Sequence, residues 1–196
     1  MSASVYCGQI IGKRLNQEDA VLIETLADDP AGQLLIVCDG MGGHAAGEIA
    51  SQRAIEAFVE EFRLSTHAVV EDKLFAALTA ANQALAREIE SNPELDGMGT
   101  TLAACFISGA DLSWISVGDS PIYLVRKAEI QTVNDDHSMA PVLDAMVASG
   151  EMSQSEALAS TNRNALRSAL MGEQPPLIDL KTKASFLESG DMVIVA

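Results

Sequence analysis

Aromatic side chains, basic residues and long apolar runs are all scarce in this sequence. Only 4% of the 196 residues are aromatic whereas 48% are hydrophobic, so the core has to be built from alanine, leucine, valine, isoleucine and methionine. Lysine and arginine number 12 against 28 aspartates and glutamates, which leaves a formal charge of −16. Such an acidic chain is not expected to bind nucleic acids or anionic membranes. No apolar run approaches the length of a transmembrane helix.

Cysteine is also rare, and Cys7, Cys38 and Cys105 all fall in apolar segments. Their odd number and their spacing fit no zinc-binding pattern, which favours buried, reduced thiols in a cytoplasmic protein. The N-terminus has no basic region followed by an apolar stretch, so no secretory signal is predicted. The length suits one globular domain. The sequence does not determine the oligomeric state, and a monomer is expected.

The most informative feature is a carboxylate at the end of an apolar run. Residues 34–38 are all non-polar, and they are followed by Asp39, Gly40 and then two further glycines. Such a run between glycines predicts a buried strand that holds Asp39 rigidly at its mouth. Glycines after the carboxylate let backbone carbonyl oxygens approach a ligand closely. Together these groups offer part of the oxygen shell that a hard divalent cation prefers.

Two other interpretations compete for this segment. The spacing of Gly40, Gly42 and Ala45 formally matches a dinucleotide-binding fingerprint. That fingerprint requires a second strand ending in an acidic residue about 20 residues further on, but Glu60 and Glu61 lie there in a helical pattern. The other interpretation is an ordinary strand, turn and helix, because Asp-Gly is common in turns. A second acidic site is needed to decide.

That second site lies upstream, between two strand-like segments. Arg14 is followed four residues later by the adjacent carboxylates Glu18 and Asp19. A guanidinium suits phosphate oxygens, and carboxylates suit metal ions, so the cluster has the components that phosphoryl transfer needs. Alone, such a cluster is typical of a solvated turn.

The order of elements predicts an α+β layered fold in which short connections make the strands antiparallel. Helices are expected over 47–64 and 69–91, with smaller helical segments near 140–149 and 154–160. Strands are expected over 4–12, 20–26, 33–39, 100–108, 112–117, 122–126, 130–133, 165–171, 178–184 and 192–196.

Five motifs in order resemble those of the metal-dependent protein phosphatases of type 2C, and the resemblance is greatest to the bacterial serine/threonine form. They are Arg14 to Ala20, Val37 to His44, Gly97 to Thr101, Val117 to Pro121 and Asp136 to Ser138; a later stretch, 162–166, is also similar. The resemblance implies a four-layer α-β-β-α sandwich of two antiparallel sheets flanked by helices. It also implies a single catalytic domain over 1–196, with a small helical flap at about 138–163.

The resemblance further implies roles for single residues. Asp39 would bridge two Mn²⁺ or Mg²⁺ ions, with the Gly40 carbonyl on one ion and Glu18 on the other. Asp19 would support the second ion, and Asp119 would bind a third. The implied reaction is hydrolysis of phosphoserine and phosphothreonine on proteins, including substrates of a serine/threonine kinase, in a signalling role. In this scheme Arg14 grips the phosphate and His44 passes a proton to the leaving alcohol.

The chain departs from the family pattern at its end, because family members continue into an Asp-Gly motif and a later Asn-Asp motif that supply metal-binding aspartates. We therefore expect a catalytic domain that is incomplete at its C-terminus. The alternative function is a catalytically incomplete, phosphatase-like regulator that binds phosphoprotein or metal. A third, weaker possibility is nucleotide binding at residues 40–45.

Overall fold

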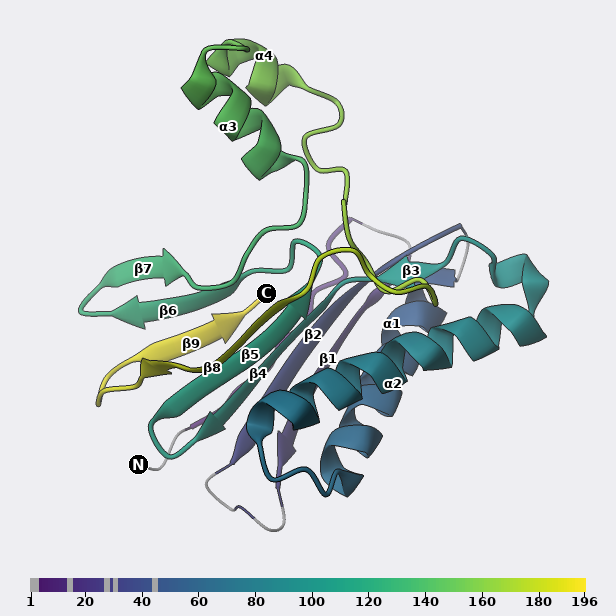
Figure 1. Cartoon of the computed structure of the whole chain (residues 1–196), viewed down its shortest axis with the longest axis vertical. Coiled ribbons are helices and arrows are strands. Elements are labelled where there is room, and N and C mark those ends of the chain that lie inside the picture. Colours follow the sequence, from purple (N-terminus) through teal and green to yellow (C-terminus); the bar gives the residue numbers. More distant parts are fainter. Residues whose placement is uncertain (1–3, 14–15, 27–28, 30–31, 44–45) are drawn as a thin grey trace.

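Two antiparallel sheets, stacked face to face and covered by helices on one side, form the body of the protein (Figure 1). The computed structural model describes residues 4–13, 16–26, 29, 32–43 and 46–196. The predicted fold class, α+β with two antiparallel sheets and helices, is confirmed.

The larger sheet has the strand order β1-β2-β4-β5-β8, with the short β3 paired to β2. Burial alternates along β2, so Leu34, Ile36 and Cys38 face the helices and are completely or almost completely buried. Core packing of this strand therefore fixes the positions of Asp39 and Gly40, which follow Cys38. The strands are β1 (Asp19–Thr25), β2 (Gln33–Met41), β3 (Gly99–Thr100), β4 (Leu102–Ser108), β5 (Asp111–Val117) and β8 (Asp179–Phe186).

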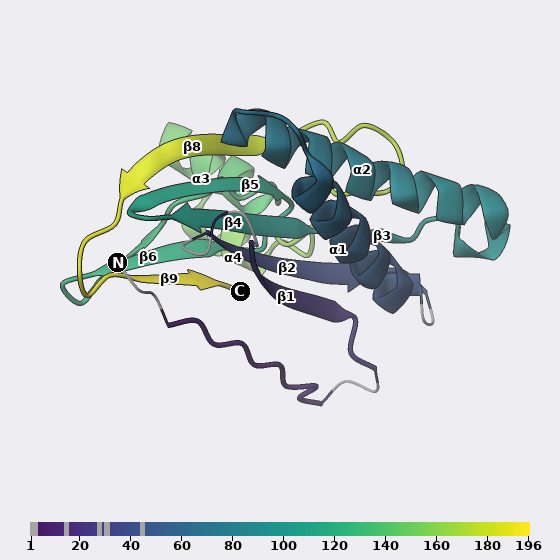
Figure 2. The ribbon, with the colours of Figure 1, turned by 90° about the horizontal axis from the view of Figure 1, so that it is seen from below.

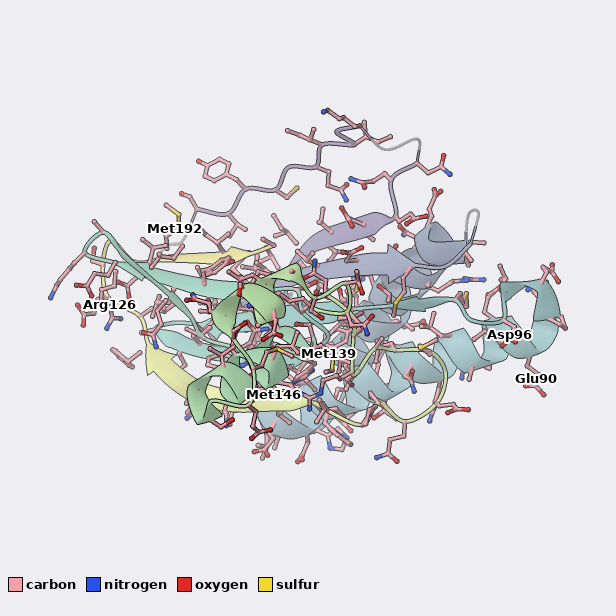
Figure 3. All side chains as sticks on the ribbon, turned by 90° about the horizontal axis from the view of Figure 1, so that it is seen from above. Glu90, Asp96, Arg126, Met139, Met146 and Met192 are labelled. Atoms are coloured by element: carbon pink, nitrogen blue, oxygen red, sulfur yellow. The ribbon has the colours of Figure 1, made fainter. Side chains whose placement is uncertain are left out.

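Two long helices, α1 (Ala46–Leu64) and α2 (Val70–Ser91), pack against this sheet and enclose the main core. Their buried stripes have the spacing that the sequence predicts. Aromatic contacts join helix to sheet, because Phe62 lies between Phe58 and Phe106, with ring centroids 6.2 and 5.3 Å away. A short 3₁₀ helix, η1 (Pro93–Leu95), follows α2. It lies near the end of the body that carries Glu90 and Asp96, opposite the end with Arg126 and Met192 (Figure 3).

The smaller sheet consists of β6 (Ile122–Arg126), β7 (Glu129–Thr132) and β9 (Met192–Val195), in the order β7-β6-β9. A second core joins its inner face to the larger sheet. This core includes Trp114 and Ile122, with Val193 and Val195 packed against it. Figure 2 shows these layers from another direction, with α1 and α2 on one side of the larger sheet and β6 and β9 of the smaller sheet on the other.

Helices α3 (Ala140–Ser149) and α4 (Gln154–Ala159) stand away from the sheets as a pair (Figure 1). They fall within residues 138–163, for which the sequence predicts a small helical flap. An isolated bridge between Ser138 and Leu166 joins the segments before α3 and after α4. Arg163, which follows α4, joins that segment to α3 by a two-pronged ion pair with Asp144, at 2.8 and 3.0 Å. Ser153 and Glu156 form a reciprocal cap at the start of α4.

Two predicted strands are wrong. Residues 4–13 are described without strand pairing and run along the outside of the body (Figure 2), where Tyr6 and Ile10 are almost fully exposed. Residues 165–171 make only single bridges, at Leu166 and Leu170, because backbone groups there hydrogen-bond to separate segments instead of one strand. Among the described residues, no helix has the length and apolar character needed to cross a membrane.

Candidate active site

The candidate site is built around Asp39 at the end of β2. Asp39 pairs directly with Asp19 of β1, so the two carboxylate side chains belong to the same face at neighbouring positions. Both side chains are half-buried. Glu18 precedes Asp19, and its carbonyl oxygen accepts hydrogen bonds from the Gly40 N–H at 3.1 Å and the Ser51 hydroxyl at 2.6 Å. The register thus brings Asp39 next to the adjacent pair Glu18 and Asp19, which lies about 20 residues earlier in the sequence.

Gly40 is required by a close approach of two backbones. A Cβ atom at this position would lie 2.0 Å from the carbonyl oxygen of Gly47 and 2.6 Å from that of Glu18. Only a residue without a side chain lets the start of α1 touch the end of β2 in this way. The end of β2 after Asp39 is therefore packed against the first turn of α1.

Asp119 comes from a different part of the chain, the turn between β5 and β6. Gly118 before it has φ of +105°, and a Cβ there would lie 2.6 Å from Thr101 Cγ2. The Gly118 N–H donates to His137 Nδ1 at 3.2 Å, and the His137 N–H donates back to the Gly118 carbonyl at 3.1 Å. These paired bonds hold the turn so that exposed Asp119 reaches the site.

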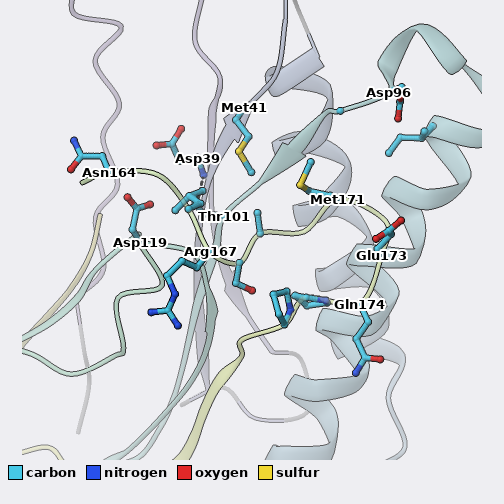
Figure 4. Close-up of a pocket in the computed structure, with 17 residues that line it drawn as sticks. Asp39, Met41, Asp96, Thr101, Asp119, Asn164, Arg167, Met171, Glu173 and Gln174 are labelled. Atoms are coloured by element: carbon cyan, nitrogen blue, oxygen red, sulfur yellow. Dashed lines mark hydrogen bonds between the residues drawn. The ribbon is translucent and has the colours of Figure 1, made fainter. Parts of the chain in front are cut away.

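Asp39 and Asp119 line the same cleft, which has a volume of about 760 Å³. In Figure 4 the two carboxylates lie at one end of the cleft, Met41 and Met171 lie along its middle, and Asp96 and Glu173 lie at the far end. Thr101 and Arg167 also line this cleft. The cleft is long enough to extend well beyond the two carboxylates.

Charge and burial shift the pKa of two groups at this end of the cleft. Partial burial raises the pKa of Asp119, and the nearby negative charge of Asp136 raises it further. Burial lowers the pKa of His137, against the opposing effect of Asp135, Asp179 and Asp136. A neutral His137 is consistent with its Nδ1 atom accepting the Gly118 hydrogen bond.

The structure places five of the seven predicted site residues. Glu18, Asp19, Asp39 and Gly40 lie together, and Asp119 lies across the cleft; Arg14 and His44 lie outside the described residues. Within the described ranges, no three His, Cys, Asp or Glu side chains form a group that could hold a metal ion by themselves. The donor chemistry still fits a hard cation, since all these candidates offer oxygen atoms.

Sequence reasoning gave no role to Thr101, Ser120 and His137, which shape the site through hydrogen bonds. Thr101 and Ser120 sit inside motifs that the sequence singles out, but their contact joins segments that no local pattern relates. His137 lies in another of these motifs, and it shapes the site through its paired hydrogen bonds with Gly118.

The fold and the site define a layered α+β protein with an oxygen-rich cleft where the turns after β2 and β5 meet. The sequence profile of the family Protein phosphatase 2C matches residues 5–142. The chain belongs to this family.

Curated relatives include the serine/threonine protein phosphatase PstP of Mycobacterium tuberculosis, which is 37% identical over 161 residues. Another is the serine/threonine phosphatase Stp of Listeria monocytogenes, 32% identical over 159 residues. The matches cover 82% and 79% of this chain, but only 29% and 61% of the respective relatives. The chain therefore spans less than two thirds of the length of either relative.

Among solved structures, the catalytic domain of PstP in complex with two manganese ions superposes with a TM-score of 0.69 at 34% identity. That match covers 93% of this chain and 71% of the PstP domain. The shared fold therefore includes nearly the whole chain described above.

Proposed function

We propose that this chain hydrolyses phosphoserine and phosphothreonine on proteins, using a water molecule activated between two divalent cations. The observation that carries the proposal is the placement of Asp39. It lies near the end of a strand fixed by the core, pairs with Asp19, and shares its cleft with Asp119. The names of the relatives and the manganese ions in the PstP structure support the same reaction class.

In this proposal Asp39 would be shared by two Mn²⁺ or Mg²⁺ ions, the Gly40 carbonyl and Glu18 would each serve one ion, and Asp19 would support the second. Asp119 would contribute to holding a third. When bound, such ions supply a water of lowered pKa and screen the phosphate charge. The chain's own part is to hold these oxygens in place, because a ligand on a rigid strand needs no reorganisation during the reaction.

Two further roles belong to residues outside the described part of the chain. Arg14 would grip the phosphate oxygens with its planar guanidinium, and His44 would pass a proton to the leaving alcohol. Both assignments rest on the sequence motifs. Arg14 lies four residues before Glu18, and His44 lies five after Asp39, so each is close along the chain to a candidate ligand.

The proposed reaction also implies partners and a cellular location. We propose phosphoproteins made by a serine/threonine kinase as substrates, in a bacterial cytoplasmic signalling role, with the chain acting as a monomer. The charge of −16 supports the absence of nucleic-acid and anionic-membrane partners. Cys38 and Cys105 are free and buried, whereas Cys7 is exposed, so the expectation of a buried thiol is wrong for Cys7. Free thiols suit a reducing compartment.

One observation favours the alternative function, a regulator that binds phosphoprotein or metal without turnover. The described residues contain no group of three His, Cys, Asp or Glu side chains arranged to hold a metal. A site with too few ligands would bind cations weakly, and a weakly bound pair would not activate water efficiently.

The deciding experiment compares Asp39→Asn with the parent chain in Mn²⁺-dependent phosphate release from a phosphothreonine peptide. A neutral amide bridges two cations poorly, so we expect turnover to fall by about 100-fold or more. Glu60→Gln is the matched control, because it removes one negative charge from the exposed face of α1.

Turnover by the parent and by Glu60→Gln, with loss in Asp39→Asn, supports the enzyme. Saturable binding of the phosphopeptide by the parent without phosphate release would favour the regulator. Equal turnover in Asp39→Asn and the parent would refute the assignment of Asp39.

A further inference from the structure

Thr101 links the two halves of the candidate site through a single buried hydroxyl. It accepts a hydrogen bond from the Asp39 N–H at 2.9 Å, and it shares a hydrogen bond with the Ser120 hydroxyl at 2.7 Å. Thr101 and Ser120 are 2% and 7% exposed, so this contact is shielded from water. Ser120 directly follows Asp119, so the hydroxyl pair connects the backbone of one candidate ligand to the turn that carries the other.

Each end of this link is anchored separately. The Asp39 carbonyl accepts the Thr101 N–H at 2.9 Å and the Thr100 hydroxyl at 3.0 Å. At the other end, the Ser120 carbonyl accepts the Asn134 side-chain amide at 3.0 Å. The same amide also donates to Ser116 Oγ at 3.1 Å.

The Thr101 methyl group has a separate role from the hydroxyl. A side chain at residue 118 would lie 2.6 Å from Thr101 Cγ2, so the methyl occupies the space that Gly118 leaves. Packing by the methyl and bonding by the hydroxyl can therefore be removed independently, by serine and by valine respectively.

We propose that Thr101 and Ser120 are positioning residues, whose hydroxyl pair sets the spacing between Asp39 and Asp119 across the cleft and thereby the affinity for the divalent cations held there. The inference rests on the proposed function and adds a determinant of metal affinity to it. A buried hydrogen bond in low dielectric holds its partners within a narrow range of distances. Residues that orient metal ligands in this way typically change metal affinity by about 10–100-fold when they are replaced.

The test measures Mn²⁺ affinity by calorimetry for the parent, Thr101→Val, Thr101→Ser and Ser120→Ala. Valine keeps the shape of threonine and removes the hydroxyl, so we expect affinity to fall about tenfold or more. Ser120→Ala should produce a loss of the same kind, because it removes the other half of the pair. Thr101→Ser keeps the hydroxyl and should stay within about threefold of the parent.

The double variant Thr101→Val/Ser120→Ala should bind Mn²⁺ no more weakly than Thr101→Val alone, because valine at residue 101 already removes the contact that Ser120→Ala breaks. Amide hydrogen exchange supplies a readout without metal. The Asp39 amide should exchange faster in Thr101→Val and should keep its protection in Ser120→Ala, where Thr101 still accepts its hydrogen bond. Melting temperatures in a chelator check that each variant folds. If Thr101→Val does not fold, the Mn²⁺ affinity of Ser120→Ala alone tests the inference.

Mn²⁺ affinities of Thr101→Val and Ser120→Ala that both match the parent would overturn the inference while leaving the phosphatase proposal intact. Weakened Mn²⁺ binding in these variants, with no turnover by the parent, would support the inference and overturn the phosphatase. A parent chain that binds no Mn²⁺ would overturn both.

Discussion

Replacing Gly40 by alanine should disrupt the contact between the end of β2 and the start of α1 and so destabilise the fold. The added Cβ would lie 2.0 Å from the Gly47 carbonyl oxygen and 2.5 Å from its carbonyl carbon, and both atoms belong to backbone. A backbone neighbour cannot rotate away as a flexible side chain can, so the helix has to move off the strand.

Over-packing a core usually costs about 1–3 kcal/mol, and a clash with backbone belongs at or above the top of that range. We therefore expect the free energy of unfolding to fall by about 3 kcal/mol or more. For a domain of this size, such a loss lowers the melting temperature by roughly 6–12 °C. It is also a large part of the total stability, about 5–15 kcal/mol, of a typical domain.

Gly43→Ala is the matched control, since a Cβ at residue 43 meets nothing within 4 Å. Urea denaturation of the metal-depleted chain compares both variants with the parent and separates stability from metal binding. The Gly40→Ala midpoint should fall clearly, and that of Gly43→Ala should barely change. Equal midpoints for the two variants would show that α1 does not rest on Gly40.

Two further predictions concern charge and the flap. Because the folded pKa of Asp119 is raised above the ordinary value of 3.8, the folded chain binds its proton more tightly than the unfolded chain, and stability from this group declines as pH rises through that raised pKa. Asp119→Asn should therefore make the metal-free chain slightly more stable than the parent at pH 7. The gain should be less than about 1 kcal/mol, because water screens an exposed group. The difference in stability should disappear below pH 3.8. Thermal unfolding in a chelator at both pH values measures this, and a less stable Asp119→Asn at pH 7 would contradict it. Arg163→Lys should loosen α3 and α4, because lysine cannot make the two-pronged contact with Asp144. The backbone amides of α3 and α4 should therefore exchange hydrogen faster than in the parent. Arg53→Lys, which changes an ion pair elsewhere, is the control. Unchanged exchange in α3 and α4 would show that this ion pair does not order them.

The sequence predicts the position of Asp39 well because β2 carries strong, redundant signals. A continuous apolar run, the glycine after it and the helical stripe of α1 all place the change from strand to helix just after Asp39. The long helices are predicted for the same reason, because their buried faces repeat at helical spacing.

The remaining errors and omissions concern contacts between distant segments. The apolar pattern of residues 4–12 resembles a strand, but a strand needs a partner that local sequence cannot identify. The register that pairs Asp19 with Asp39, and the hydroxyl contact of Thr101 with Ser120, likewise depend on how whole strands align. No residue pattern within either segment specifies such alignments in advance.

The central claim is that the cleft of Asp39 and Asp119 is a divalent-cation site, and titration of Mn²⁺ into the metal-depleted chain tests it most directly. Calorimetry should show saturable binding by the parent and by Glu60→Gln, and a large loss of binding in Asp39→Asn. Binding of equal affinity in Asp39→Asn, or no saturable binding by the parent, would contradict the claim.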